Sequence, residues 1–559
     1  MQAISTHISR AHISRQSIER LYISMRHLFL RGQYKPLGMS GAAMIRALLA
    51  LNPEIYGLIN DPEKVELEGL LYIFQRLPLG IEQCRYINLI TREGYEDSGF
   101  DALVPSKRRR NCYRLDNEQM MIEMTRGLSD IFDCLTHLTF MYIESEKIRN
   151  NALDSKNRET RAWTMLGEIV KKIEAGEKFD EQVGFSYLSS LLGRTYDDVK
   201  EAYSKFEDAE KINSLFSIVY WMGAISIQEY KDEKDREITF SSSLRERIGH
   251  HMYGESWANQ IKQKLSELNL FDRPVHIISS NLHSVMNCFF ASSALQKTHA
   301  DKSIEEIAEV LSDGANSNLR KKVKKYALSH GMYEIHDNSG TNISVQLFDL
   351  EQVDKKDLKN VYCNEGPHNA VIVVMDYAFG QQAYETMDEL LKPFEIGEEK
   401  RKLDVRSVNI MGKAGILTGA KGDIMIPNAH IFEGSADNYP FENALQVDMF
   451  NDDEIKVYQG PMITVLGTSL QNKNILRYFM KSSWGVIGLE MEGAHYQKAI
   501  QSASKIRNSV SPDLDIRYAY YASDNPLESG ATLASGSLGL DGVKPTYLIT
   551  TQILKGILG

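Results

Sequence analysis

Three short motifs in the second half of the chain combine carboxylic acids with glycines in a way that suits a small-molecule site. They are Gly412–Gly415 (GKAG), Glu490–Gly493 (EMEG) and Ser523–Pro526 (SDNP). A carboxyl group that a pocket partly removes from water has a raised pKa and is suited to acid catalysis. Glycines allow a ligand to approach the backbone, since no side chain fills the space. We expect these motifs to line one pocket, if the fold brings them together.

Apolar runs precede the motifs and predict the β-strands that must position them. The runs are Val371–Met375, Val405–Met411, Trp484–Leu489 and Ile516–Ala522. The first run leads into a turn that ends at Gly380, which adds a further glycine. Strands that each stop at Gly, Asp or Glu are typical of a mostly parallel sheet, because ligands bind where the carboxyl ends of the strands give way to loops. The pattern therefore predicts an α/β fold for this half.

The region before these strands adds one more strand, several helices and a hairpin. Val275–Ile278 is the first predicted strand, and the small polar turn 279–284 leads into a helix at 285–295. Such a turn is equally suited to binding an anion at the helix N-terminus and to ordinary N-capping. Helices are predicted at 303–311 and 316–329. The alternation in 332–350 predicts a hairpin with its turn at 338–340.

Apolar residues at three- and four-residue steps dominate the first half and predict helices. The stripes are Ser17–Leu28, Gly41–Leu51, Gln119–Ile148, Thr160–Ile173 and Val199–Ile227. Thr195 and Asp198 have the spacing of a capping box. We predict an all-α domain at 1–240, a linker and helix at 241–271, and an α/β domain with a central mixed sheet flanked by helices at 272–559. The charged and serine-rich segment 231–243 is the best candidate linker.

Two polar patterns in the helical half have chemical interest. One helical face carries Asp133, His137, Phe140 and Glu144. These residues form either a metal or acid-base site or a hydrogen-bonded seam between packed helices. We favour the seam, because no second cluster of His, Cys or Glu completes a ligand set. The run Lys107–Arg110 (KRRR) is either a phosphate or partner site or a solvated loop, and we favour the loop.

Composition excludes several classes of function. The chain has 559 residues, 43% hydrophobic and 25% charged, and a formal net charge of -11. Its length predicts at least two domains, and its negative balance disfavours binding to nucleic acid or an anionic membrane. The five cysteines, Cys84, Cys112, Cys134, Cys288 and Cys363, show neither a disulfide framework nor zinc spacing. We find no signal peptide or membrane span and expect a cytoplasmic protein.

The order of the motifs resembles that of the purine nucleoside phosphorylase and nucleosidase superfamily, and within it the AMP nucleosidases. The resemblance rests on GKAG at 412–415, GDIMIP at 422–427, EGSADNY at 433–439, EMEG at 490–493 and SDNP at 523–526. It covers residues 275–559. The N-terminal half resembles no family that we recognise.

The resemblance implies roles for individual residues. Asp524 matches the acid that protonates N7 of the departing purine, with Ser523 and Asn525 beside it. Glu492 matches the glutamate that accepts hydrogen bonds from the ribose hydroxyls, and a carboxylate suits a vicinal diol because it offers only acceptors. Its neighbours Met491 and Glu490 are expected near the sugar, with Met491 packed under it. Gly412, Ala414, Gly415 and Gly380 are expected to let the backbone approach base, ribose or phosphate.

The nucleophile is the point at which this chain departs from its relatives. Lys413 stands where phosphorylases carry a small hydroxyl residue that helps to bind phosphate. Either the lysine side chain occupies the phosphate pocket, which favours water as the nucleophile, or its charge attracts inorganic phosphate. Nucleosidases of deoxy-sulfur nucleosides have a glutamate in the loop after the first strand, and turn 279–284 has none. His283 and Glu433 are the candidates to activate water; a core or capping histidine is as probable for His283.

Three functions follow. The first is hydrolysis of a purine nucleotide, AMP foremost, to base and ribose 5-phosphate without a cofactor. The second is phosphate-dependent purine nucleoside phosphorolysis, and the third is a non-catalytic protein that senses a purine nucleotide. The resemblance also implies a homo-oligomer, a dimer or a hexamer, in which the loop 433–439 completes a neighbour's site.

Overall fold

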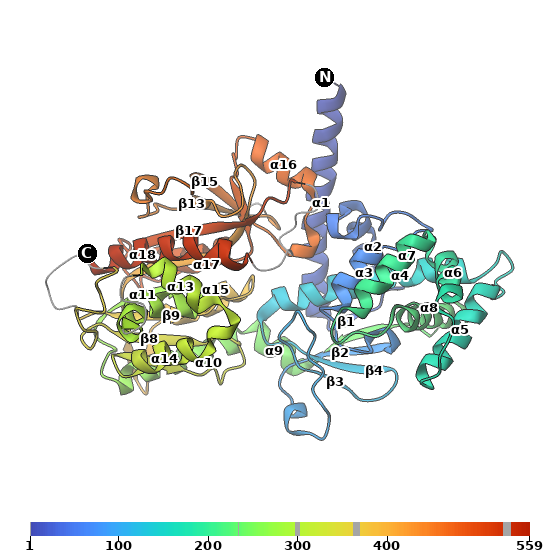
Figure 1. Ribbon diagram of the computed structural model, residues 1–559, viewed down its shortest axis with the longest axis horizontal. Helices are drawn as coiled ribbons and strands as arrows, with labels where there is room; N and C mark the ends of the chain where they lie inside the picture. Colours follow the sequence, from blue (N-terminus) through green and yellow to red (C-terminus); the bar gives the residue numbers. More distant parts are fainter. Residues whose placement is uncertain (1, 233, 297–301, 362–368, 436, 529–537) are drawn as a thin grey trace. The chain divides into compact units, whose positions relative to one another are not determined.

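The computed structural model describes residues 2–232, 234–296, 302–361, 369–435, 437–528 and 538–559 (Figure 1). The chain forms two compact units. Unit 1 comprises residues 1–250 together with 469–475, and unit 2 comprises 251–468 together with 476–559. Cys363, one of the five cysteines, lies outside the described residues. The other four are buried free thiols.

Unit 1 combines helices with a five-stranded sheet. Its helices are α1 (Gln2–Arg31), α2 (Met39–Leu51), α3 (Leu67–Phe74), α4 (Gly127–Ala152), α5 (Arg161–Glu174), α6 (Glu181–Leu192), α7 (Tyr196–Glu207), α8 (Leu215–Asp232) and α9 (Ser242–Gly249). Its strands are β1 (Gln33–Tyr34), β2 (Tyr86–Ile90), β3 (Cys112–Arg114), β4 (Gln119–Glu123) and β5 (Glu237–Phe240), in the order β1-β5-β2-β4-β3.

This sheet shows that the prediction of an all-α domain is wrong. Its strands are two to five residues long, too short to display a clear alternation. The predicted helical stripe 119–148 contains β4 before α4, because Met120 and Ile122 fit either period. The candidate linker 231–243 carries β5, which pairs in parallel with β2 inside the sheet. By contrast, the capping box of Thr195 and Asp198 at the start of α7 is confirmed.

Unit 2 is built on a mixed sheet. Its helices are α10 (Met252–Glu267), α11 (Leu282–Ala294), α13 (Ile304–Ser312), α14 (Ser317–Leu328), α15 (Gln382–Leu390), α16 (Lys473–Lys481), α17 (Gly493–Gln501) and α18 (Val543–Leu558). Helix α16 begins in the segment assigned to unit 1. The strands are β6 (Pro274–Ser279), β7 (Met332–Ile335), β8 (Val345–Asp349), β9 (Val371–Met375), β12 (Asp404–Ile416), β13 (Ile424–Phe432), β14 (Asn438–Pro440), β15 (Val457–Thr464), β16 (Gly488–Glu490) and β17 (Asp515–Asp524), with β10 (Phe394–Ile396) and β11 (Glu399–Arg401) as a separate hairpin.

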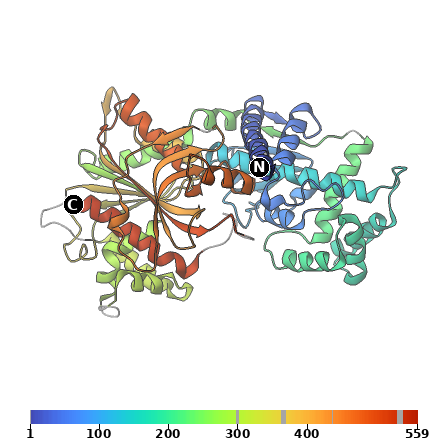
Figure 2. The same cartoon turned by 90° about the horizontal axis from the view of Figure 1, so that it is seen from above.

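Helices cover both faces of this sheet, which Figure 2 shows as a twisted fan of strands. One buried cluster joins the sheet to α10, α15 and α17. A second cluster joins its other face to α11, α13, α14 and α18. The predicted mixed sheet flanked by helices is therefore confirmed, as is the hairpin of β7 and β8.

The sheet contains antiparallel pairs within its otherwise parallel centre. β12 runs parallel to β6 and β17, but β16 runs antiparallel to β12. β17 also pairs with β13, so β13, β15, β16, β12 and β17 close into a ring of hydrogen-bonded strands. Most of the predicted strand 484–489 is irregular, and only its end belongs to β16. Glu490–Gly493 thus follows the carboxyl end of β16, which is parallel to β15 as expected but antiparallel to β12.

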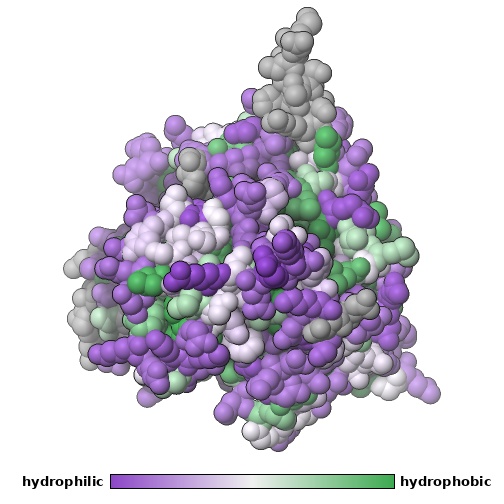
Figure 3. Space-filling view, turned by 90° about the vertical axis from the view of Figure 1, so that its right-hand side faces the viewer, coloured by the Kyte–Doolittle hydropathy of each residue, from purple (hydrophilic) through white to green (hydrophobic). Residues whose placement is uncertain are grey.

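The surface shows no continuous apolar face in the direction of view of Figure 3, where hydrophobic areas are small and separated by hydrophilic side chains. Among the helices in the described residues, none combines the length and the apolar character that crossing a membrane requires.

Candidate active site

The long strand β12 is the element that brings the predicted motifs together. Its pairing with β6 ends where Ile410 lies opposite Ser279, and the strand continues for six more residues as GKAG and its neighbours. Gly415 pairs with Asp524 of β17 on one edge and with Leu489 of β16 on the other. Because adjacent strands lie about 4.8 Å apart, the backbones of Asp524 and Leu489 are about 10 Å apart.

Asp524 is a buried carboxyl group at the end of β17. Its side chain is 7% exposed; the Ser523 hydroxyl donates to Oδ1, while Oδ2 has no hydrogen-bond partner among the described residues. Burial raises the pKa of this carboxyl group, and Lys413 partly opposes that shift. A carboxyl group with an unfilled oxygen and a raised pKa is suited to donate a proton. The Asn525 side chain donates to the carbonyl of Gly419 in the loop after β12 and accepts from the N–H of Leu527.

Glu492 and Gly380 come together, although they are far apart in sequence. The N–H of Gly380 donates to Oε1 of Glu492 at 2.9 Å. Gly380 has a φ of 55°, a conformation that glycine adopts without strain. The Glu492 carboxylate is therefore oriented by the turn after β9, and its neighbour Met491 is likewise half-buried.

Protein groups occupy both carboxylate oxygens of Glu490. Thr464 donates to Oε1, and the N–H groups of Glu492 and Gly493 donate to Oε2. Thr464 also accepts from the N–H of Ala494 at 2.8 Å. Glu490 thus caps the start of α17 and positions Glu492. Thr464 and this capping pattern were missed in the sequence, where no local signal joins β15 to the EMEG motif.

Glu433 follows β13 and lies one strand beyond Thr464. Phe432 pairs with Thr464, and Thr464 pairs with Glu490, so the two glutamates belong to one row of strand ends. Glu433 is 3% exposed and accepts from the N–H of Leu466 at 3.1 Å. Burial raises the pKa of Glu433 to about 7 and that of Glu490 to about 8, with the charge of Glu492 adding to the second shift.

These raised pKa values predict a pH dependence of stability. An unfolded glutamate has a pKa of about 4.3, so between that value and about 8 the folded protein holds a proton at Glu490 that the unfolded chain has lost. Stability therefore falls as the pH rises through this window, by up to about 1.4 kcal/mol per pH unit for one group. We expect Glu490→Gln, which mimics the protonated form, to remove this slope. Chemical denaturation of the parent protein and of Glu490→Gln from pH 5 to pH 9 measures the slope of stability against pH. Equal slopes for the two proteins would contradict the prediction.

His430 is a buried residue that sequence inspection missed. It is fully buried on β13, stacks on Phe441 with ring centroids 5.3 Å apart, and has its pKa lowered by burial to about 3. A Cβ on Gly493 would lie 2.2 Å from Cδ2 of this ring and 2.8 Å from Oε1 of Glu490. The glycine of EMEG is therefore required by packing, which explains part of the motif without a ligand.

We expect Gly493→Ala to lower the free energy of unfolding by about 2–3 kcal/mol, since a packed ring and a capping carboxylate have to move. Denaturant unfolding measures the change. Gly314→Ala is the control, because a Cβ at that position meets no atom within 4 Å. Equal stability of the two variants would contradict the prediction, because it would show that the ring and the carboxylate move at little cost.

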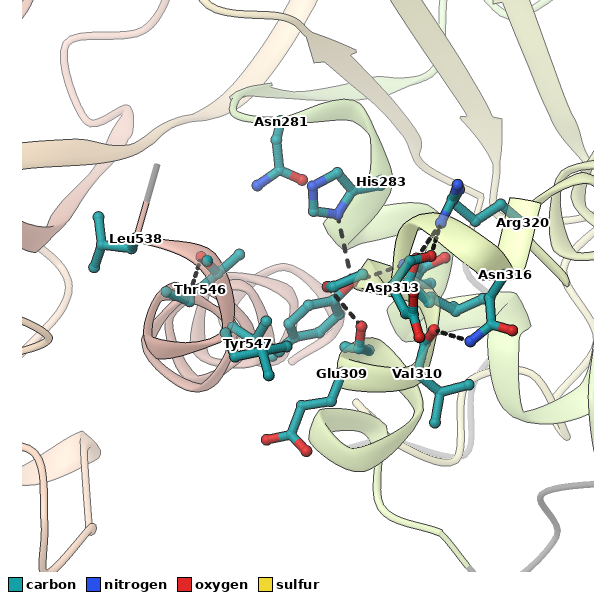
Figure 4. Close-up of a pocket in the computed structure, with 18 of the residues that line it drawn as sticks. Asn281, His283, Glu309, Val310, Asp313, Asn316, Arg320, Leu538, Thr546 and Tyr547 are labelled. Carbon is teal, nitrogen blue, oxygen red and sulfur yellow. Dashed lines mark hydrogen bonds between the residues drawn. The ribbon is translucent and has the colours of Figure 1, made fainter. Parts of the chain in front are cut away.

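A cavity of about 1140 Å³ adjoins the end of β12 (Figure 4). Lys413 lines it from β12, and Asn281 and His283 line it from the start of α11. The Asn281 side chain caps α11 by accepting from the N–H of Ser284 at 2.8 Å, so the capping interpretation of the turn 279–284 is confirmed. The two segments that were candidates for contact with a phosphate therefore share one cavity.

A hydrogen-bonded chain leads from Asn287 through Tyr547 to His283. Asn287 donates to the hydroxyl of Tyr547 at 2.7 Å, and that hydroxyl lies 3.5 Å from Nδ1 of His283 (Figure 4). When Tyr547 donates to Nδ1, the neutral ring keeps its proton on Nε2. Desolvation lowers the pKa of His283, which favours this neutral form. In this state His283 offers the cavity a donor, which does not suit the role of base.

The polar face of α4 in unit 1 is a seam of ion pairs. The carboxylate of Asp133 accepts from Nε and Nη2 of Arg108, both at 2.8 Å, and from Arg110 at 2.8 Å. Glu144, further along the face, pairs with Lys147 at 2.9 Å. The seam that we favoured is therefore the observed arrangement. The interpretation of Lys107–Arg110 as a solvated loop holds for Lys107 and Arg109, which are exposed, and is wrong for Arg110, which is 5% exposed and paired.

No group of three or more His, Cys, Asp or Glu side chains among the described residues is arranged to hold a metal ion. The set that the structure brings together in unit 2 is instead two capped or oriented glutamates, one buried aspartate and the glycines of β12. We take this set as the candidate acid-base site of unit 2.

Comparisons with known proteins show the family. A model described as "Family of unknown function (DUF6909)" matches residues 42–329 and 309–559, and the chain belongs to this family. No curated protein matches the sequence.

Three solved structures illustrate the similarity that a structural search finds. Helicobacter pylori MTAN is 12% identical with a TM-score of 0.29, covering 50% of this chain and 99% of its own. Futalosine hydrolase of Helicobacter pylori is 13% identical with a TM-score of 0.29, covering 51% and 98%. Isoform 2 of uridine phosphorylase from Schistosoma mansoni is 13% identical with a TM-score of 0.29, covering 55% and 88%. Likeness at this level gives no ground for transferring an activity.

Proposed function

We propose that unit 2 hydrolyses the N-glycosidic bond of a purine nucleotide, AMP foremost, to the free base and ribose 5-phosphate. The observation that carries the proposal is the pairing of Gly415 with Asp524 on one edge of β12 and with Leu489, which leads to Glu492, on the other. Asp524, the acid for the base, thereby lies about two strand spacings, roughly 10 Å, from the strand that leads to Glu492, the acceptor for the ribose. The motif resemblance supplies the substrate class.

The reaction uses residues of this chain only. The C1′–N9 bond breaks while Asp524 gives its proton to N7, so the base leaves neutral, and Glu492 holds the ribose hydroxyls. Water bonds to C1′ and loses one proton to a base, from which it passes to solvent, and solvent reprotonates Asp524. Glu433 is the better candidate for that base, because its pKa of about 7 allows it to accept a proton near neutral pH. Glu490 acts as a positioning residue.

The 5′-phosphate is assigned to the cavity beside β12. Lys413 is exposed to this cavity, and Asn281 and His283 present polar groups to it. A cation and neutral donors together suit a phosphate dianion. The same groups suit inorganic phosphate, which is the specific observation that favours phosphorolysis as the second candidate.

We expect Lys413→Met to lower kcat/KM for AMP by about 10- to 100-fold and to leave kcat/KM for adenosine within about 2-fold, since only the nucleotide has a charge for Lys413 to bind. Steady-state assays with AMP and with adenosine measure the ratio of the two kcat/KM values. Lys421→Met is the control, because this exposed lysine pairs with Asp541 on the surface. Equal losses on both substrates would place the phosphate elsewhere.

The decisive experiment is incubation of the purified protein with AMP, with and without inorganic phosphate, followed by chromatography of base and sugar products. Adenine and ribose 5-phosphate without added phosphate are the expected result. Release that depends on phosphate would indicate a phosphorylase. Tight binding of AMP with no release would indicate a sensor, and neither binding nor release would overturn the proposal. Light scattering of the same sample tests the proposed homo-oligomer.

A further inference from the structure

A short segment from the second half of the chain belongs to unit 1. It comprises Ser469–Ile475, at the end of the loop after β15 and the start of α16, and the residues on either side of it belong to unit 2. The chain therefore passes from unit 2 into unit 1 and back again within a few residues. This link is covalent, so it exists for any arrangement of the two units.

Asn472 anchors this segment at the carboxyl end of α2. Its Nδ2 donates to the carbonyl of Leu51 at 2.7 Å and to that of Asn52 at 3.3 Å. The last carbonyls of a helix have no partner within the helix and carry a partial negative charge, so an amide donor is favourable there. Oδ1 of Asn472 accepts from the N–H groups of Asn474 and Ile475 and caps the start of α16. Both polar groups of this side chain thus fix the segment.

Glu54 provides a second anchor, just beyond α2. Its N–H donates to the carbonyl of Gln471 at 2.9 Å, and its Oε1 accepts from the N–H of Lys473 at 3.2 Å. These two bonds lie on either side of Asn472 in the sequence. The stretch 51–54 of unit 1 therefore holds three consecutive residues of the segment, 471–473.

The residues that precede the segment bind the two buried glutamates of unit 2. The carbonyl of Thr464 accepts from the N–H of Glu433 at 2.9 Å, and the N–H of Val465 donates to the carbonyl of Glu490 at 2.8 Å. The N–H of Leu466 donates to Oε2 of Glu433 at 3.1 Å, and the Thr464 hydroxyl donates to the Glu490 carboxylate. The stretch 464–466 thus positions both glutamates.

Only two residues, Gly467 and Thr468, separate these two sets of contacts. From Leu466 to Ser469 the chain spans at most about 11 Å. A displacement of the segment held in unit 1 is therefore absorbed by these two residues or passed on to Leu466. The N–H of Leu466 is the donor to the Glu433 carboxylate, so this atom is where a loosened anchor affects the candidate site.

We propose that unit 1 holds Leu466 against Glu433 through the segment 469–475, and that Asn472 is a positioning residue for the reaction proposed for unit 2. The catalytic part of this inference rests on the proposed function, in which Glu433 accepts a proton from water. The anchoring by unit 1 does not rest on it. Unit 1 thereby has a role in fixing the geometry of the base.

Asn472→Asp tests the anchor, because it removes the donor to α2 and keeps the acceptor that caps α16. We expect the amide of Leu466 to exchange with deuterium about 10-fold faster than in the parent protein, since the bonds to Leu51 and Asn52 no longer resist opening. Mass spectrometry of peptides that cover 464–468, in the full-length protein, measures the exchange. Asn474→Asp makes the same change of charge two positions further on and is the matched control. Unchanged exchange in Asn472→Asp would overturn the proposal.

The pH profile of kcat for base release from AMP tests the positioning role. A base acts when deprotonated, so kcat rises as the pH rises through the pKa of Glu433, which is about 7. The N–H of Leu466 stabilises the charged carboxylate, and its loss raises this pKa. We expect the rising limb to move to higher pH by about one unit in Asn472→Asp and to stay in place in Asn474→Asp.

The two measurements separate failure of the anchor from failure of the proposed function. An unmoved limb in an active Asn472→Asp would overturn the positioning role. If the parent protein releases no base, the proposed function and the positioning role fail together, while faster exchange in Asn472→Asp still supports the anchor in unit 1.

Glu54 allows the same test from the side of unit 1. Glu54→Ala removes the acceptor for the N–H of Lys473, whereas Glu54→Gln retains one. We therefore expect faster exchange and a moved limb in Glu54→Ala and the behaviour of the parent protein in Glu54→Gln. Glu54 is exposed, so this pair decides the proposal if Asn472→Asp does not fold. Parent behaviour in Glu54→Ala would contradict an anchor at this residue.

Discussion

Asp524→Asn is expected to lower kcat for base release from AMP by about 10³-fold, with KM changed by less than about 3-fold. Asparagine preserves the shape of the side chain and the contact with Ser523, but it has no proton to give to N7. The loss is therefore a loss of general acid catalysis. Steady-state kinetics on AMP measures it, and circular dichroism shows whether the variant is folded.

A substrate with a better leaving group sharpens this test. A ribose 5-phosphate with a 4-nitrophenyl leaving group at C1′ needs little protonation, so we expect Asp524→Asn to lose less than about 10-fold on it. Asp513→Asn is the matched control, because Asp513 is exposed in the loop before β17. Equal losses on the two substrates would show that Asp524 contributes binding or structure and is not the acid.

Glu492→Gln is expected to lower kcat/KM for AMP by about 100-fold, which corresponds to about 2.7 kcal/mol. The variant keeps an acceptor for the N–H of Gly380, but it places an amide donor where the ribose hydroxyls need acceptors. The hydrogen bonds that are lost involve a charged group, and such bonds contribute about 1.5–3 kcal/mol.

The sugar dependence identifies the group that Glu492 binds. We expect the parent protein to prefer AMP over 2′-deoxy-AMP and the variant to treat the two nearly alike, because the 2′-hydroxyl no longer has its acceptor. Glu398→Gln, in the exposed turn of the β10–β11 hairpin, is the control and keeps the preference. A variant that still discriminates fully would place the ribose elsewhere.

Glu490 and Glu492 illustrate why the candidate site was only partly predictable. The two residues share one motif and identical side chains, so sequence alone assigned both to the substrate. In the structure Glu490 accepts hydrogen bonds from Thr464 and two N–H groups of its own motif, whereas Glu492 accepts from Gly380 in the turn after β9. Their surroundings differ because Thr464 contacts Glu490 and Gly380 contacts Glu492, and neither contact can be inferred from the motif.

Local patterns in the sequence were enough to predict single helices, strands and caps and to identify the candidate acids. The capping box at Thr195, the cap at Asn281 and the β7–β8 hairpin were predictable, because each depends on residues within about twenty positions of one another. The strands before Asp524 and GKAG were likewise predictable from their apolar runs. Capping residues and alternating apolar residues are local patterns, and they can be recognised without knowledge of the rest of the fold.

Only the tertiary structure decided which of these elements meet. It assembled a sheet in unit 1 from strands too short to alternate, and it brought Arg108 and Arg110 onto Asp133. It also placed β16 antiparallel to β12. Asp524 on β17 and the EMEG segment after β16 therefore lie on opposite edges of β12, at the ends of strands that run in opposite directions. Strand pairing and buried ion pairs join residues that are far apart along the chain. Their free energy depends on how far the groups are removed from water, which a local sequence pattern does not indicate.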